Sequence, residues 1–247
     1  MILFVSDLHL SAQTPALTRI FLDFLGGRAR NAEALYILGD LFEYWVGDDD
    51  LENETNGRVA AALRELADTG VAVNVMHGNR DFLMGEGFAA ASGARLLPDP
   101  YMLSTPEWQF ILSHGDALCS DDREYQQFRT QSRSPEWQAA FLQKPLAERR
   151  AIAVALRAQS EAGRKEKTGS TGYLMDLNPG ETDDFLRLHG YATFIHGHTH
   201  RPARHDHIVD GIHVERWVLA DWHEDGGHPT AECLVWDGEA LHREKLT

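Results

Sequence analysis

Five short polar clusters each follow a run of apolar residues, and their side chains are of the kinds that bind divalent cations. The clusters read Asp7-Leu8-His9, Gly39-Asp40, Gly78-Asn79-Arg80-Asp81, Ser113-His114-Gly115-Asp116 and His196-Gly197-His198-Thr199-His200. Carboxylate, imidazole and amide groups are common ligands of manganese, zinc and iron. A lone cluster of this kind arises often by chance. Five clusters at five predicted strand ends share one explanation, which is a metal site assembled from all of them.

Taken singly, each cluster also has a plain structural interpretation. Asp40 could cap a following helix, and Asn79 could stabilise a tight turn. Asp7 and His9 are two residues apart, so on an extended chain both side chains would point the same way and reach one cation. Gly39 would let the backbone turn sharply and bring the carboxylate of Asp40 over the sheet edge. There its two oxygens could bridge two metal ions.

The elements that must position these clusters are buried strands alternating with amphipathic helices. The first half predicts strands at 2–6, 35–38 and 71–76, with helices at 16–24 and 59–66 between them. This order is typical of an α/β unit with a largely parallel sheet, whose ligands collect at the carboxyl ends of the strands. Five further strand candidates lie at 101–103, 110–112, 193–195, 217–219 and 233–236. They favour a second sheet packed on the first.

Between about residues 120 and 168 the pattern becomes helical, interrupted at Pro145. We expect this segment to be a helical insertion over the catalytic face, within a single domain that spans residues 1–247. Residues 123–167 carry ten basic and five acidic side chains, a formal charge of +5 in a chain of net charge −15. The asymmetry indicates an anionic partner or surface for the insertion, although solvated helix faces would give the same composition.

The composition excludes several classes of protein. Two cysteines in 247 residues make no disulfide framework and no cysteine zinc site, which favours a reducing, cytoplasmic setting. No signal peptide precedes the first strand, and no apolar stretch approaches the roughly 18 residues of a spanning helix. The net charge of −15 argues against a general nucleic-acid binder.

Two cations a few ångströms apart would suit the hydrolysis of a phosphoester. They supply a nucleophile stronger than water and offset the charge that grows on the phosphoryl oxygens. Aspartate and histidine donors with one asparagine oxygen suit Mn²⁺, although zinc or iron could also occupy such a site. The spacing alone therefore predicts a two-metal phosphoesterase, which we expect to hold two Mn²⁺ per chain.

In this order the five motifs resemble those of the calcineurin-like metallophosphoesterase superfamily, from Asp7 to His200. The resemblance implies a four-layer αββα sandwich of two mixed sheets. It implies that the first metal is held by Asp7, His9, Asp40 and His200, and the second by Asp40, Asn79, His114 and His198. It also implies that the catalytic residues are Asp40, Asn79, Arg80 and His114. His196 lies outside the pattern.

Arg80 is an informative departure from many phosphomonoesterases of this superfamily, which resemble one another in having histidine after the motif asparagine. A histidine can protonate a poor alkoxide leaving group, whereas an arginine does not titrate near neutral pH. Arg80 can instead stabilise a leaving group that is already acidic, such as a phosphate. The residue therefore points to the cleavage of a pyrophosphate bond.

Residues 39–50, 77–83 and 196–202 also resemble the UDP-2,3-diacylglucosamine pyrophosphatase family of lipid A biosynthesis. The resemblance implies attack on the phosphorus next to uridine, which releases UMP and 2,3-diacylglucosamine 1-phosphate. It implies a lipid-linked nucleotide sugar as substrate, and peripheral attachment to the cytoplasmic face of the inner membrane of a Gram-negative bacterium. We expect a monomer.

The same resemblance implies substrate contacts in the clusters and in the insertion. They are Asn79, Arg80, Asp122, Ser160, Arg164, Lys167 and His198, with Arg164 standing where some members have asparagine. Two acyl chains need an apolar slot, which the aromatic and aliphatic stripe of the insertion could supply. The stripe consists of Phe128, Trp137, Phe141, Ile152 and Leu156. Part of it could equally be the insertion's own packing.

Two other kinds of function stay open on the sequence alone. A different member of the superfamily could act on a soluble dinucleotide or a cyclic nucleotide, and such an enzyme would scarcely need the apolar stripe. A chain without activity could retain the metals as a scaffold for a partner protein. Phosphodiesterase activity with added Mn²⁺ would distinguish an enzyme from a scaffold.

Overall fold

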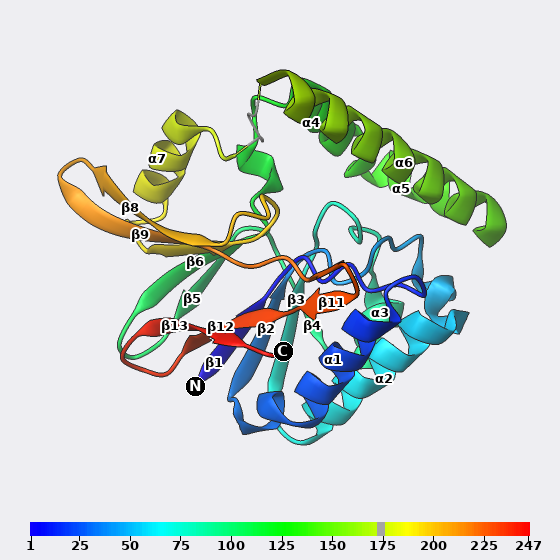
Figure 1. The fold of residues 1–247 in the computed structure, drawn as a ribbon, viewed down its shortest axis with the longest axis horizontal. Helices are drawn as coiled ribbons and strands as arrows, with labels where there is room; N and C mark the ends of the chain where they lie inside the picture. Colours follow the sequence, from blue (N-terminus) through cyan, green and yellow to red (C-terminus); the bar gives the residue numbers. More distant parts are fainter. Residues whose placement is uncertain (172–175) are drawn as a thin grey trace.

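Two stacked β-sheets with helices on their outer faces form the body of the protein (Figure 1). The structure is a computed structural model that describes the backbone of residues 1–171 and 176–247, and the side chains of residues 1–158 and 176–247. Three further helices lie together beyond one end of the sheets. The predicted αββα sandwich with a helical cap is therefore confirmed.

The first sheet has six strands in the order β13-β12-β1-β2-β3-β4. Their bounds are β1 (Ile2–Val5), β2 (Ala34–Leu38), β3 (Ala72–Met76), β4 (Arg95–Leu97), β12 (Glu232–Trp236) and β13 (Leu241–Lys245). Strands β1 to β4 run parallel, while β12 is antiparallel to β1. The assignment of 233–236 to the second sheet was wrong. Residues on both faces of β12 are buried, as suits a strand inside the first sheet, and chain order alone does not reveal this.

The second sheet has five strands in the order β5-β6-β7-β9-β8. They are β5 (Tyr101–Ser104), β6 (Gln109–Ser113), β7 (Thr193–His196), β8 (Ala203–Val209) and β9 (Ile212–Val218). Strands β6, β7 and β9 run parallel, and the edge strands β5 and β8 are antiparallel to their neighbours. The sequence did not predict β8 because its residues are mostly polar. A short hairpin, β10 (His223–Asp225) and β11 (His228–Thr230), follows β9.

Helices cover the outer face of each sheet. The first sheet is covered by α1 (Pro15–Gly26), α2 (Glu54–Asp68) and α3 (Glu86–Ser92), and the second by α7 (Pro179–Leu188). Asn53 accepts hydrogen bonds from the backbone N–H groups of Thr55 and Asn56, which caps α2 and starts it before the predicted 59–66. Short 3₁₀ helices span Arg28–Asn31, Asp48–Glu52 and Asp116–Leu118.

The alternation of side chains along β1 shows why the layers stack. Leu3 and Val5 pack against the helices, whereas Ile2 and Phe4 pack between the two sheets. The ring of Phe4 lies 6.1 Å, centroid to centroid, from that of Phe110 in β6. Because β1 is apolar on both faces, it must lie inside the molecule, and the polar residues that follow it emerge at the end of the sheet.

The cap consists of α4 (Arg123–Ser132), α5 (Pro135–Leu142) and α6 (Leu146–Thr171), and its last helix extends three residues beyond the segment of about 120–168 predicted to be helical. Pro145 directly precedes α6. This position suits a proline, because its ring would break a helix at an interior position. Arg149 of α6 donates to both carboxylate oxygens of Asp49 and to the carbonyl of Val46, and Arg150 donates to Asp50. These contacts hold the cap against the loop that follows β2.

The predicted apolar stripe of the cap divides into two parts. Phe141 is buried in the core beside the first sheet, and Trp137 stacks on it with ring centroids 4.9 Å apart. Ile152 is half-buried and packs on the same core, whereas Leu156 is 39% exposed. Phe128 meets Trp137 edge to face. Phe141 therefore serves the packing of the cap, and Leu156 is free to meet another apolar surface.

Among the described residues, no helix combines the length and the apolar character that crossing a bilayer requires.

Candidate metal centre

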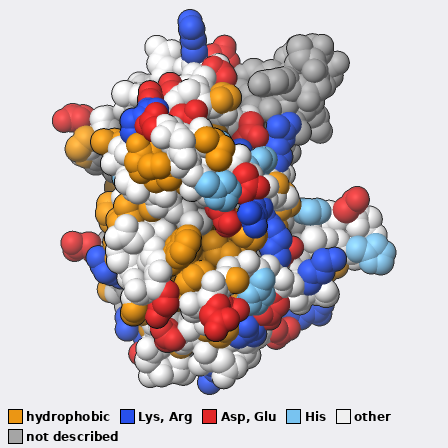
Figure 2. Space-filling model, turned by 90° about the vertical axis from the view of Figure 1, so that its left-hand side faces the viewer, with side chains coloured by type: hydrophobic (Ala, Val, Ile, Leu, Met, Phe, Trp, Pro, Cys, Tyr) orange, Lys and Arg blue, Asp and Glu red, His pale blue; other side chains and the backbone are white. Residues whose placement is uncertain are grey.

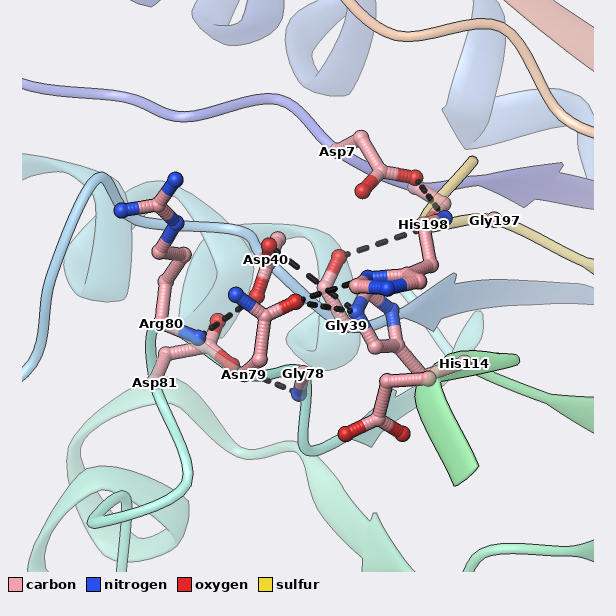
Figure 3. Close-up of polar contacts among 12 residues, drawn as sticks. Asp7, Gly39, Asp40, Gly78, Asn79, Arg80, Asp81, His114, Gly197 and His198 are labelled. Atoms are coloured by element: carbon pink, nitrogen blue, oxygen red, sulfur yellow. Dashed lines mark hydrogen bonds and ion pairs between the residues drawn. The ribbon is translucent and has the colours of Figure 1, made fainter. Parts of the chain in front are cut away.

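The predicted ligands all lie just beyond the carboxyl ends of parallel strands. Asp7, Asp40 and Asn79 follow β1, β2 and β3 of the first sheet, while His114 and His198 follow β6 and β7 of the second. Because both sheets end at the same side of the sandwich, the side chains turn toward one another (Figure 3). The structure therefore brings the five clusters of the sequence together at one place.

Five of the predicted ligands have left-handed backbone conformations that non-glycine residues rarely adopt. They are Asp7 (φ 55°), His9 (φ 49°), Asp40 (φ 51°), His198 (φ 67°) and His200 (φ 53°). We expected the side chains of Asp7 and His9 to point the same way because the chain is extended there. That reason was wrong, since the backbone is not extended at either residue. The two side chains meet because the backbone turns at each of them, while the N–H groups of both donate to the loop after β2. Strain of this kind concentrates at functional sites.

Asp7, His9 and His200 form the first group of donor atoms. The Nε2 atoms of His9 and His200 are 3.3 Å apart, and Nε2 of His200 is 3.3 Å from Oδ1 of Asp7. That Oδ1 atom is buried and has no hydrogen-bond partner among the described residues. Burial lowers the pKa of His9 well below its usual value, so its ring is neutral at pH 7 and offers a lone pair. A cation fits this group.

Asn79, His114 and His198 form the second group. Oδ1 of Asn79 is 3.0 Å from Nε2 of His114 and 2.8 Å from Nδ1 of His198. Nδ1 of His114 donates to the carbonyl of Leu38, which leaves Nε2 pointing at Asn79. Burial also lowers the pKa of His198 to about 4. Two ring nitrogens thus converge on one amide oxygen, as around a second cation.

Asp40 lies between the two groups. Its Oδ2 atom is 3.9 Å from Nε2 of His114, and the ligand atoms of Asp7, Asp40 and His114 all lie within 4.8 Å of one another. Its Oδ1 atom accepts a hydrogen bond from the N–H of Arg80. Burial raises the pKa of Asp40 to about 7. A carboxylate in this position needs positive charge nearby to stay ionised, which a pair of cations would supply.

Two glycines permit the close approach of these loops. A Cβ atom on Gly39, whose φ is 92°, would lie 2.5 Å from Nδ1 of His114. A Cβ atom on Gly197 would lie 2.1 Å from Oγ of Ser6 and 2.3 Å from Oδ2 of Asp7. Any side chain at either position would push the donor groups apart. The positive φ of Gly39 agrees with the sharp turn predicted there.

Comparison with known proteins identifies the family of this chain. The family model for calcineurin-like phosphoesterases matches residues 1–202. The chain belongs to this family. It is 52% identical to a UDP-2,3-diacylglucosamine hydrolase of Aromatoleum aromaticum, over 96% of this chain and 93% of that protein. It is 53% identical to the Chromobacterium violaceum protein of the same name over 91% of both chains, and 47% identical to that of Stenotrophomonas maltophilia strain K279a over 98% and 99%.

Membership of the calcineurin-like phosphoesterases implies that the chain binds divalent metal. The donor groups described above are its candidate ligands. The fit is chemical as well as geometric, because buried carboxylate and imidazole donors converge, and Oδ1 of Asp7 and Nδ1 of His9 have no hydrogen-bond partner among the described residues. Carboxylate, imidazole and amide donors also match what divalent metals of this kind prefer.

Asp81 is a buried residue beside the candidate ligands to which the sequence analysis gave no role. Its side chain is fully buried and accepts hydrogen bonds of 2.8 Å from the N–H groups of both Leu41 and Gly78. It thereby joins the loops after β2 and β3, which carry Asp40 and Asn79. In the sequence, only its position two residues after Asn79 pointed to a place beside the candidate ligands.

Asp116 anchors the cap of the phosphoesterase to the same loops. Its buried Oδ2 accepts hydrogen bonds from the hydroxyl of Tyr125 at 2.5 Å and from Nε of Arg129 at 2.8 Å. Arg133, the residue directly after α4, donates to the carbonyl of Gly78 at 2.8 Å. The ring of Tyr125 stacks on that of His198 at 5.9 Å. The sequence placed Asp116 in a cluster but could not reveal its partners on α4.

A second link runs between the cap and the first group of donors. Arg157 of α6 forms an ion pair with Glu43, whose other oxygen is 3.8 Å from Nδ1 of His9. His200 has a similar outer neighbour, because its Nδ1 is 3.5 Å from Oδ2 of Asp221. Carboxylates in such positions orient the imidazole rings that bind metals.

The structure describes the surroundings of some of the predicted substrate-binding residues but not of others. Nε of Arg80 is buried without a hydrogen-bond partner among the described residues. Asp122 accepts from the N–H of Tyr125 and caps α4. The side chains of Ser160, Arg164 and Lys167 lie outside the described residues.

Replacing Asp81 tests how the donor loops are held. In Asp81→Asn only one side-chain oxygen remains, so one buried N–H group meets an amide donor at a cost of about 1–3 kcal/mol. We expect metal affinity, measured by calorimetry, to fall about 10- to 100-fold. Asp184→Asn is the control, because Asp184 is exposed and its ion pair with Arg187 lies within α7. Unchanged affinity in the Asp81 variant would contradict the role given to this carboxylate.

Proposed function

We propose that this phosphoesterase hydrolyses the pyrophosphate bond of UDP-2,3-diacylglucosamine, releasing UMP and 2,3-diacylglucosamine 1-phosphate. The observation that carries the proposal is Arg80, a cationic side chain with a buried Nε, beside a dinuclear donor set. The names of the relatives support the same substrate. Arg80 favours cleavage of a pyrophosphate bond, since the leaving group is then a phosphate. Attack at the phosphorus next to uridine is proposed from the family resemblance of the sequence.

The proposed cofactors are two Mn²⁺ ions. One would be held by Asp7, His9, Asp40 and His200, and the other by Asp40, Asn79, His114 and His198. When bound, such a pair activates water and offsets the charge on the phosphoryl oxygens. The mixed carboxylate, imidazole and amide donors support manganese.

The protein's own residues orient the substrate. The N–H of Arg80 donates to Asp40, which fixes the start of the Arg80 side chain relative to the donor set. Its guanidinium is a planar fork of donors that matches phosphate oxygens. Because the guanidinium stays protonated, it can stabilise the departing phosphate without giving up a proton. Asn79 and His198 would contact the same phosphates.

The cap would bind the rest of the substrate. Asp122, Ser160, Arg164 and Lys167 are proposed to contact the sugar and phosphate. Phe128 is half-buried, and Leu156 is 39% exposed. We assign these two, with the half-buried Trp137, to the acyl chains rather than Phe141, which the core already buries.

We propose further that the chain works as a monomer on the cytoplasmic face of the inner membrane, attached through the cap. Leu142, Val154 and Leu156 on α5 and α6 are 42%, 54% and 39% exposed, and the cap segment carries a formal charge of +5. Exposed apolar side chains among basic ones favour an anionic lipid surface. On the face shown in Figure 2, basic side chains are interspersed with acidic ones. Since the net charge of the chain is −15, we propose no nucleic-acid partner.

The reaction itself gives the first test. Incubation with UDP-2,3-diacylglucosamine and Mn²⁺ should release UMP, a chelator should stop the reaction, and Asp40→Ala should abolish turnover while its circular dichroism stays native. ADP-ribose, a soluble pyrophosphate, serves as the control substrate and should react far more slowly. Release of UDP would place the cut at the sugar and overturn the proposal. Equal turnover of ADP-ribose would favour a soluble substrate instead.

Arg80→Ala tests the assignment of the leaving group. Loss of the guanidinium should lower pyrophosphate turnover on the order of 100-fold, because a preorganised charge is removed from the departing phosphate. Hydrolysis of an activated aryl phosphodiester, whose leaving group needs little help, should fall much less. Arg95→Ala is the control, since Arg95 lies over Tyr101 away from the centre. Equal losses on both substrates would argue against this role for Arg80.

Vesicle sedimentation tests the proposed attachment to the membrane. The chain should bind vesicles that contain phosphatidylglycerol more tightly than neutral ones, and salt should weaken the binding. Val154→Glu should reduce it, because a charge then replaces an exposed apolar side chain. Leu188→Glu is the matched control, since Leu188 is 79% exposed but lies on α7. An equal effect of the two variants would contradict docking through the cap.

A further inference from the structure

His196 is a buried histidine in the cluster that supplies two predicted metal ligands, yet the ligand pattern leaves it without a role. It is the last residue of β7 and is fully buried. Its Nε2 atom lies 3.1 Å from Nη1 of Arg216, and its Nδ1 atom lies 2.8 Å from the carbonyl oxygen of Gly197. Both ring nitrogens are therefore already engaged by the protein.

The two partners dictate the form of the ring. A guanidinium can only donate, so Nε2 of His196 accepts from Arg216. Nδ1 must then carry the hydrogen, which it donates to the carbonyl of Gly197. The neighbouring positive charge of Arg216 also repels any cation at this ring. His196 is thus held as one neutral tautomer and does not serve as a metal ligand.

The peptide group between Gly197 and His198, whose carbonyl accepts from His196, makes two more hydrogen bonds. Its carbonyl also accepts from the N–H of Thr199 at 2.8 Å, and its N–H, that of His198, donates to Oδ2 of Asp7 at 2.8 Å. The preceding peptide group is held as well, because the N–H of Gly197 donates to the carbonyl of His114 at 3.0 Å. The orientation of one peptide therefore decides where His198 begins. Since His198 has a left-handed conformation, that peptide needs to be held firmly.

Arg216 is itself fixed by three neighbours. It lies on β9 and is 6% exposed. Besides His196, its guanidinium donates to Nε2 of His207 at 3.2 Å and lies 3.5 Å from Oδ1 of Asp176. Asp176 is the first described residue after 172–175, on the stretch that leads from the cap to α7. Arg216 therefore connects the ligand loop with the chain that returns from the cap.

We propose that His196 is a positioning residue, locked by Arg216 in the tautomer that holds the peptide group between Gly197 and His198 and so places the metal ligands His198 and His200. Packing alone is the competing explanation, because the ring also stacks on Phe194 at 4.7 Å. Packing would require neither the hydrogen on Nδ1 nor the arginine. The two explanations differ in what a ring of similar size without nitrogens would do.

His196→Phe and His196→Asn separate these explanations. Phenylalanine keeps the stacking but loses both polar contacts, whereas the asparagine amide can donate to the Gly197 carbonyl from about the position of Nδ1. We expect His196→Phe to weaken metal binding about 10- to 100-fold by calorimetry. His196→Asn should recover most of that loss even if it is the less stable variant. Native metal affinity in His196→Phe, or no recovery in His196→Asn, would overturn the proposal.

Arg216→Met provides a second route if the His196 variants do not fold. It keeps an apolar stem but removes the donor that fixes the tautomer, so metal affinity should again fall. Arg243→Met is the matched control, because Arg243 is another part-buried arginine of this region that binds backbone carbonyls and Glu232. Equal affinities in the two arginine variants would contradict the proposal. Because metal binding is measured without substrate, the result is independent of whether UDP-2,3-diacylglucosamine is the substrate.

Discussion

The burial of two carboxylates side by side, Asp7 and Asp40, is the constraint on which the rest of this structure depends. Both side chains have lost almost all contact with water. Oδ1 of Asp7 has no hydrogen-bond partner among the described residues, and burial raises the pKa of Asp40 to about 7. A divalent cation pair would offset that loss. The left-handed backbone at the ligands, the glycines beside them and the cross-link through Asp81 all place donor atoms around the same point.

The same loops also hold the cap, so the cap and the candidate metal ligands share one framework. Asp116 follows the candidate ligand His114 and bonds to α4, and Glu43 lies between the candidate ligand His9 and Arg157 of α6. Arg133 reaches the carbonyl of Gly78, next to Asn79. A shift of the cap would therefore displace the candidate metal ligands. The basic character of the cap serves partly these internal contacts and partly its exposed surface.

The sequence predicted the layers and the donor set because both leave local patterns. Apolar runs that end in polar clusters identified β1, β2, β3, β6 and β7, and the ligand types were evident from the clusters themselves. The sequence did not predict the interactions between segments that are distant along the chain. The pairing of β12 with β1, the bonds from Asp116 to α4 and the contact of His196 with Arg216 join residues whose separation along the chain carries no periodic signal. The sequence did not predict the turn at Asp7 and His9, because no neighbouring residue type indicates a left-handed backbone conformation at an aspartate.

The central claim is that donor atoms from the ends of both sheets surround two cations with Asp40 between them. Anomalous diffraction from crystals grown with Mn²⁺, recorded near the manganese absorption edge, tests it most directly. The account predicts two anomalous peaks, one among Asp7, His9 and His200 and the other among Asn79, His114 and His198, each in contact with Asp40. A single peak, or a peak that Asp40 does not contact, would contradict the account.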